Sequence, residues 1–161
     1  MTIGKEFEVS FSILPTLFPS NIKYSNVIRF TTNINENCCD SGWRVPGVWF
    51  YNNDGRVDAR KLYISFDVND NGNYKVITDR HRYLLNYWIM VSIGQYRVDD
   101  GSYIYYVDIN GDRIREKVNS RPKVYHGVTV FAGDPVHEVQ EGWIQNLKIK
   151  SGSFTFSILN L

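Results

Sequence analysis

Residues 103–118 read YIYYVDINGDRIREKV, and this stretch decides the fold. Apolar and polar side chains alternate along Tyr103–Ile109 and again along Arg113–Val118, which is the two-residue period of a half-buried strand. Asn110-Gly111 lies between the two runs. Both central residues of a type I′ turn need a positive φ, and an Asn-Gly pair adopts it readily. The stretch therefore predicts an antiparallel β-hairpin.

The same alternation recurs outward from this hairpin over most of the chain. It covers Phe7–Ile13, Val27–Thr32, Val45–Tyr51, Leu62–Val68, Tyr74–Val76, Leu85–Ile93, Val124–Val130, Trp143–Ile149 and Phe154–Ile158. Aromatic residues make up 15% of the chain, and Ala59 and Ala132 are its only alanines, which favours strands over helices. About eleven strands without a convincing helix predict a β-sandwich or barrel.

Chain length and net charge further limit the number of domains and the kinds of function to expect. The chain has 161 residues, so we expect a single domain, residues 1–161. Its net charge of +1 argues against a dedicated nucleic-acid binder. Residues 1–8 lack the apolar core of a signal peptide, and no stretch is apolar enough to span a membrane as a helix.

Seven short segments occur in an order that resembles a known family. They are Lys5–Phe11, Asn26–Thr32, Arg44–Phe50, Asn71–Tyr74, Tyr87-Trp88, Asp108–Gly111 and Glu141–Ile149. Together they resemble concanavalin A-like, laminin-G-like modules, in particular the extracellular repeats of invertebrate (cnidarian-type) matrix and adhesion proteins. The resemblance implies an all-β, two-sheet antiparallel jelly-roll sandwich. It also implies an extracellular, lectin-like module in cell adhesion.

The two cysteines, Cys38 and Cys39, are adjacent, whereas the family usually has further cysteines to pair with this segment. A disulfide between neighbours is disfavoured because their Cα atoms are only about 3.8 Å apart. Two free thiols, a strained vicinal disulfide and an intermolecular disulfide all stay open.

Catalytic patterns are weak. Glycoside hydrolases of this sandwich class carry carboxylates at alternate positions of one strand, so that they point into one groove. No strand here has that set, and His81, His126 and His137 are scattered. We therefore expect a non-enzymatic module that binds a glycan or an extracellular protein. A polysaccharide hydrolase or lyase and a self-assembling structural module are the alternatives.

One acidic segment is a candidate calcium site. Residues 67–72, DVNDNG, match the first half of an EF-hand loop, but the twelfth position is Thr78 and strands flank the segment. A hairpin turn is the simpler interpretation. Laminin-G-like modules often bind Ca²⁺ at a loop rim, so the resemblance leaves Asp67, Asn69 and Asp70 as possible ligands, with no other cofactor expected.

Ligand-binding residues are expected among exposed aromatic and basic side chains, because sugars stack on aromatic rings and anions pair with arginine. The candidates are Trp43, Arg44, Tyr103, Tyr105, Arg113 and Arg115. Trp49, Trp88 and Trp143 lie in apolar runs and are expected in the core. The expected partner is a glycan or an extracellular protein, with neither nucleic acid nor a membrane span, and self-association is possible.

Overall fold

Twelve strands and no helix make up the part of the chain that the computed structural model describes, residues 1–33, 40–52, 59–78, 81–134 and 136–160. The strands are β1 (Phe7–Pro15), β2 (Tyr24–Thr31), β3 (Gly47–Tyr51), β4 (Ala59–Val68), β5 (Asn71–Ile77), β6 (Tyr83–Leu84), β7 (Ile89–Arg97), β8 (Tyr103–Ile109), β9 (Asp112–Asn119), β10 (Thr129–Phe131), β11 (Gly142–Ser151) and β12 (Phe154–Asn160). Nothing in these ranges is a helix that could cross a membrane.

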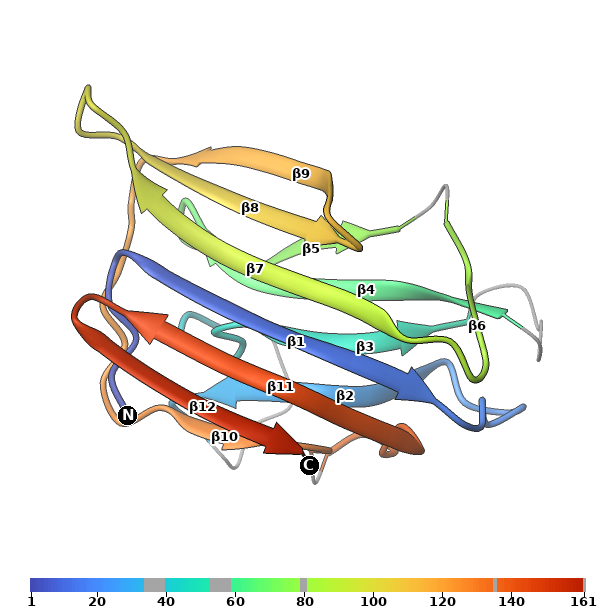
Figure 1. Ribbon diagram of the computed structural model, residues 1–161. Helices are drawn as coiled ribbons and strands as arrows, with labels where there is room; N and C mark the ends of the chain where they lie inside the picture. Colours follow the sequence, from blue (N-terminus) through green and yellow to red (C-terminus); the bar gives the residue numbers. More distant parts are fainter. Residues whose placement is uncertain (34–39, 53–58, 79–80, 135, 161) are drawn as a thin grey trace.

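The strands form two antiparallel sheets packed face to face (Figure 1). The first sheet has the order β12-β11-β1-β7-β8-β9. The second has the order β10-β2-β3-β4-β5, and the short β6 pairs with β4 beside it. The predicted all-β, two-sheet antiparallel sandwich is therefore confirmed.

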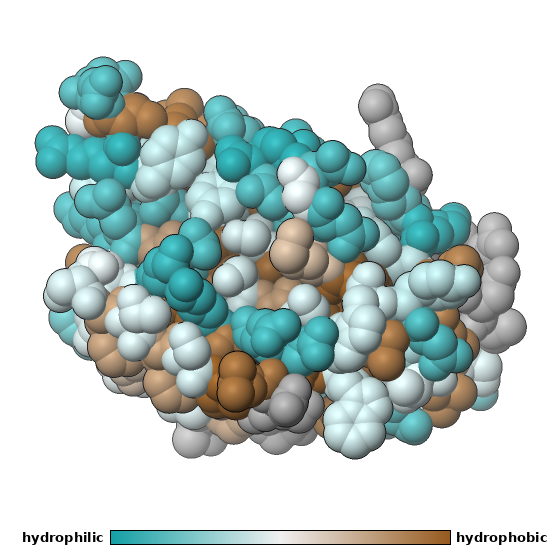
Figure 2. Space-filling view, in the orientation of Figure 1, coloured by the Kyte–Doolittle hydropathy of each residue, from teal (hydrophilic) through white to brown (hydrophobic). Residues whose placement is uncertain are grey.

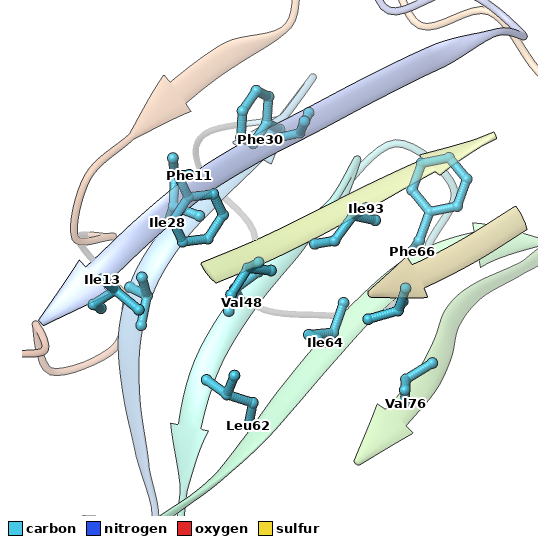
Figure 3. Close-up of a cluster of buried hydrophobic side chains, with 14 of the residues drawn as sticks. Phe11, Ile13, Ile28, Phe30, Val48, Leu62, Ile64, Phe66, Val76 and Ile93 are labelled. Carbon is cyan, nitrogen blue, oxygen red and sulfur yellow. The ribbon is translucent and has the colours of Figure 1, made fainter. Parts of the chain in front are cut away.

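The core lies between the two sheets. Each strand contributes alternate apolar side chains to it, as a two-residue period requires. Figure 3 shows Phe11, Ile13 and Ile93 of the first sheet facing Ile28, Phe30, Val48, Leu62, Ile64, Phe66 and Val76 of the second. Phe66 also stacks on Tyr105, with ring centroids 5.2 Å apart.

The predicted hairpin at residues 103–118 is formed by β8 and β9. Asn110 (φ 54°) and Gly111 (φ 90°) both adopt positive φ, as the turn requires. Two other predicted runs are wrong at one end. The run Leu85–Ile93 is interrupted at Asn86, whose φ of 61° and whose N–H bond to the carbonyl of Pro15 make a turn before β7 begins. The run Val124–Val130 is broken at Gly127, where φ is 67°.

The outer faces of the two sheets differ. In Figure 2, hydrophilic side chains gather over β8 and β9, and hydrophobic ones lie near the C-terminal strand β12. Every residue of β4, in the second sheet, is buried, including those that alternate away from the core. The outer face of the second sheet is therefore covered by other parts of the chain, and the candidate site lies there.

Candidate functional site

A groove of about 310 Å³ lies on the outer face of the second sheet, and it is polar and aromatic. Its lining residues come from four strands and two loops: Tyr24 of β2, Trp49 of β3, Tyr63 of β4, Asn73 and Lys75 of β5, Arg44 before β3, and His137 before β11. Ligand pockets in proteins usually begin at about this volume.

Strand register explains why the aromatic rings meet there. Val48 and Leu62 point into the core, so the next residues along their strands, Trp49 and Tyr63, point outward. The two are direct partners in the β3–β4 ladder, and their rings meet edge to face at 5.8 Å. Tyr24 stacks on Tyr51 at 4.9 Å and contacts Tyr63 at 5.4 Å. Burial, followed by the phenols of Tyr51 and Tyr63, raises the pKa of Tyr24, so this phenol stays neutral at physiological pH.

Arg44 lies in the groove over the ring of Trp49 and is only 8% exposed. Its guanidinium carbon is 4.8 Å from the centre of the Trp49 ring, a cation–π distance. Its Nη1 donates to Asn73 Oδ1 at 2.5 Å and to the Tyr63 hydroxyl at 3.5 Å. Both partners are neutral. Within the described residues no carboxylate pairs with Arg44, so a nearly buried cation faces the groove without an internal counter-ion.

Asn73 holds this arrangement together. Its side-chain oxygen accepts from Arg44, from the Tyr63 hydroxyl at 3.1 Å and from the Ser65 hydroxyl at 2.8 Å. Three donors on one amide oxygen fix the direction of Arg44. Because the acceptor is an amide and not a carboxylate, the positive charge is oriented but not neutralised.

The wall beside β2 is built by His137 and a buried ion pair. His137 Nδ1 lies 3.0 Å from Asp134 Oδ2, and Arg29 Nη1 lies 3.2 Å from the same oxygen. Burial alone would raise the pKa of Asp134. Hydrogen bonds from His137 and the Val136 N–H, together with the charge of Arg29, outweigh burial and lower that pKa to about 2. Asp134 is therefore a fixed anion behind the imidazole.

The loop that carries His137 is tied to β2. The Asn26 N–H donates to the Glu138 carbonyl at 2.7 Å, and the Gln140 N–H donates to the Asn26 carbonyl at 2.8 Å. The ring of His137 then meets the edge of Trp49 at 5.6 Å. His137 and Tyr63 thus flank Trp49 from opposite sides, since β3 lies between β2 and β4.

Of the predicted ligand residues, the structure brings only Arg44 into this groove. Trp43 is half-buried beside it, and its carbonyl accepts a bond from Arg29. Tyr105 lies in the core with no exposed surface, and the half-exposed Tyr103 belongs to the first sheet. A core position favours a structural role for Tyr105.

The predicted basic stripe also lies elsewhere. Arg113 and Arg115 are exposed on β9, the edge strand of the first sheet. Arg113 is ion-paired with Asp108 and with Glu116, the latter at 2.7 Å. Its charge is therefore compensated within the strand pair β8–β9, unlike that of Arg44.

The tryptophan expectation is correct for Trp49 and wrong for two others. Trp49 is 1% exposed, whereas Trp88 is 45% and Trp143 62% exposed. Trp143 is opposite Leu14 in the ladder, one position from the buried pair Ile13–Ile144, so its side chain points away from the core. An apolar run alone does not specify which face of the sheet is covered.

The candidate calcium ligands do not converge on one empty point. The Lys123 ammonium lies 3.0 Å from Asp67 and 2.8 Å from Asp70, between the two carboxylates. Bonds from Lys123 and Arg121 lower the pKa of Asp70. Asn69 turns to the end of β9, where its Nδ2 donates to the Val118 carbonyl. Calcium binding at these residues stays a prediction. Cys38 and Cys39 lie outside the described residues.

Most residues of the groove were not predicted from the sequence, namely Tyr24, Trp49, Tyr63, Asn73, Lys75 and His137. The sequence of β4 held one clue to the site. Tyr63 and Ser65 alternate with the core residues Leu62, Ile64 and Phe66, which predicts that both point to the outer face of the sheet. The residues from β2, β5 and the loops could not be joined to them without the strand order.

Comparison with known proteins supports the fold. No protein-family model and no curated protein matches the chain. Among solved structures, it is similar to a heptameric SAP-like pentraxin from Limulus polyphemus (TM-score 0.51, 15% identity, 92% of this chain and 66% of the other). It is also similar to a variant of the alginate lyase Aly36B in complex with alginate tetrasaccharide (TM-score 0.54, 14% identity, 94% and 71%).

These similarities show the jelly-roll β-sandwich, as the sequence predicted, and the chain spans only about two thirds of the length of each neighbour. At such low identity they say nothing about individual residues. The resemblance to cnidarian-type matrix repeats stays a prediction.

Proposed function

We propose that the protein binds an acidic glycan in the groove on the outer face of the second sheet. The observation that carries this proposal is Arg44, a residue only 8% exposed that lines the groove and whose hydrogen-bond partners among the described residues are neutral. A buried charge is costly unless an opposite charge meets it. A ligand carboxylate or sulfate supplies that charge, and arginine binds either through two parallel N–H bonds.

The remaining groups fit a sugar. Half-exposed Tyr24 offers an aromatic face to the C–H groups of a pyranose, and Asn73 and Lys75 offer donors for hydroxyl or acidic oxygens. The alginate lyase neighbour holds an alginate tetrasaccharide, so the fold is compatible with an oligosaccharide ligand. The proposed setting is extracellular, as the laminin-G-like resemblance implies.

Calorimetric titration tests this proposal with three probes: a polyuronate, the same polymer after reduction of its carboxyl groups, and a sulfated polysaccharide. We expect binding of at least one acidic probe and no binding of the reduced polymer. Equal binding of the reduced polymer would overturn the proposal. Running each titration with and without EDTA tests the calcium prediction at Asp67, Asn69 and Asp70 separately.

Arg44→Gln is the diagnostic variant, and Arg115→Gln is its matched control on the far edge of the first sheet. A hydrogen bond to a charged group contributes about 1.5–3 kcal/mol, so Arg44→Gln should weaken binding about 10- to 100-fold. Arg115→Gln should leave affinity unchanged. Melting temperatures of both variants separate a lost contact from a lost fold.

A further inference from the structure

We infer that one end of the sandwich docks on a lipid bilayer through an exposed, uncharged patch of aromatic and aliphatic side chains. We call this surface the end patch. Its members are the exposed large hydrophobic residues Leu17, Leu84, Tyr87, Trp88, Met90 and Trp143. The end patch shares no residue with the groove on the outer face of the second sheet, so this inference does not depend on the proposed function.

The structure brings together three segments that are far apart in the chain. Trp143, at the start of β11, is opposite Leu14 in the ladder with β1. On the other side of β1, the Asn86 N–H donates to the Pro15 carbonyl at 2.8 Å, and β7 begins three residues later. Figure 1 shows the β1–β2 loop, the turn from β6 to β7 and the start of β11 at the same end of the sandwich. The end patch is therefore one surface.

An apolar groove extends this surface. It has a volume of about 510 Å³ and is lined by residues 17–22 and by Leu85. Leu17 belongs both to the groove and to the end patch. Phe18, beneath it, is buried and its ring lies 5.1 Å from that of Phe50 in the core. The groove thus offers further apolar surface to acyl chains beside the exposed residues.

The charge pattern favours a bilayer over a second copy of the chain. Residues 9–22, 83–96 and 142–147 carry no charge, although charged residues make up 22% of the chain. Lys23, Arg82 and Glu141, all exposed, border these segments at the patch end, so the border is net positive. Lipid phosphates attract such a border. A symmetric dimer would instead place the border against its own copy, because the same surface is used on both subunits.

The composition of the end patch is typical of a membrane–water interface. Tyr and Trp rings collect there because the ring is apolar and the O–H or N–H is polar. Leu and Met side chains beside them reach the acyl region. The turn that carries the two loop aromatics is also fixed in advance: Asn86 adopts a φ of 61°, and the Met90 N–H donates to Asn110 Oδ1 at 2.8 Å. Docking therefore costs little conformational entropy.

Vesicle flotation measures docking directly. The probes are vesicles of phosphatidylcholine, with and without phosphatidylglycerol, in buffer with EDTA so that no divalent cation links protein and headgroup. The wild-type protein should float with both, and more strongly with the anionic vesicles because of the net positive border. The fluorescence of the exposed Trp88 and Trp143 should shift to shorter wavelength as the rings leave water.

Two single variants and a matched control test the surface. Leu17→Ser and Trp143→Gln should each lower the vesicle partition coefficient about tenfold, because each removes apolar area that docking would bury. Phe154→Gln is the control: Phe154 is 46% exposed but pairs with Ser151, at the opposite end of β11. It should float like wild type. Melting temperatures of all three variants separate a lost contact from a lost fold.

The outcomes separate the possible occupants of the end patch. Absence of flotation with both kinds of vesicle overturns the inference. Equal flotation of wild type, Leu17→Ser and Trp143→Gln overturns the assignment to the end patch. A dimer in light scattering that Trp143→Gln dissociates, without any flotation of wild type, overturns the lipid occupant in favour of a second copy. Arg44→Gln should float like wild type, since the glycan groove is a separate surface.

Discussion

Replacing Asn73 by aspartate would test the proposal that Arg44, which has no carboxylate partner among the described residues, binds the acidic ligand. The change is nearly isosteric, and Arg44, Tyr63 and Ser65 could all donate to the new carboxylate as they donate to the amide oxygen. Arg44 would then have an internal counter-ion. The ligand would have to compete with it.

The magnitude follows from the geometry. Opposite charges about 4 Å apart attract by about 4 kcal/mol at an effective dielectric constant of about 20. Most of the ligand's charge-assisted bond to Arg44 would therefore be lost. With such a bond contributing about 1.5–3 kcal/mol, we expect the Kd for an acidic glycan to rise about 10- to 100-fold. The melting temperature at neutral pH should be unchanged or higher.

The pH dependence supplies an internal check. Three donors and one positive charge lower the pKa of the new carboxyl in the folded state. Its effect on binding is therefore present at neutral pH and disappears as the pH falls through that lowered pKa. A sulfated polysaccharide keeps its own charge over this range, so its affinity for Asn73→Asp should recover in acid while that of Asn73→Gln should not. An Asn73→Asp protein that binds acidic glycans as well as wild type at neutral pH would refute the role given to Arg44.

Three further predictions concern stability. Because the pKa of Asp134 is lowered to about 2, its stabilising effect is complete above about pH 4 and is lost as the pH falls toward 2; acid titration of urea unfolding should show this slope in wild type and not in Asp134→Asn. Phe66→Ala should lower the unfolding free energy by about 3–5 kcal/mol, since the ring is buried against Phe7 and Tyr105. A loss below about 1 kcal/mol would contradict the packing described. Trp143→Gln should change the unfolding free energy by less than about 0.5 kcal/mol, because 62% of the side chain is exposed.

The sheet architecture could be predicted well because its signals are local. Alternation along Tyr103–Ile109 and the Asn110-Gly111 turn involve neighbours in sequence, and both are confirmed. The same logic failed at Asn86 and Gly127. There a single positive φ ends a run that the apolar pattern alone would continue.

The candidate site could be predicted only in part, and Arg44 is the part that was found. Arg44 stands out in sequence because it precedes an apolar strand in an irregular segment. The position of His137 depends on Asp134, which is ion-paired with Arg29, about a hundred residues away in the chain. No spacing rule joins these three residues.

By itself the sequence determined an all-β sandwich or barrel, because a two-residue period and turn chemistry act over a few residues; the two-sheet jelly roll was implied by the family resemblance. Only the tertiary structure decided which of the aromatic and basic side chains form a site. Strand order brought Tyr24, Trp49, Tyr63 and Asn73 side by side, and the loops buried Arg44 among neutral partners. In the proposed function, burial is what makes Arg44 an anion-binding group, and burial is a property of the assembled fold.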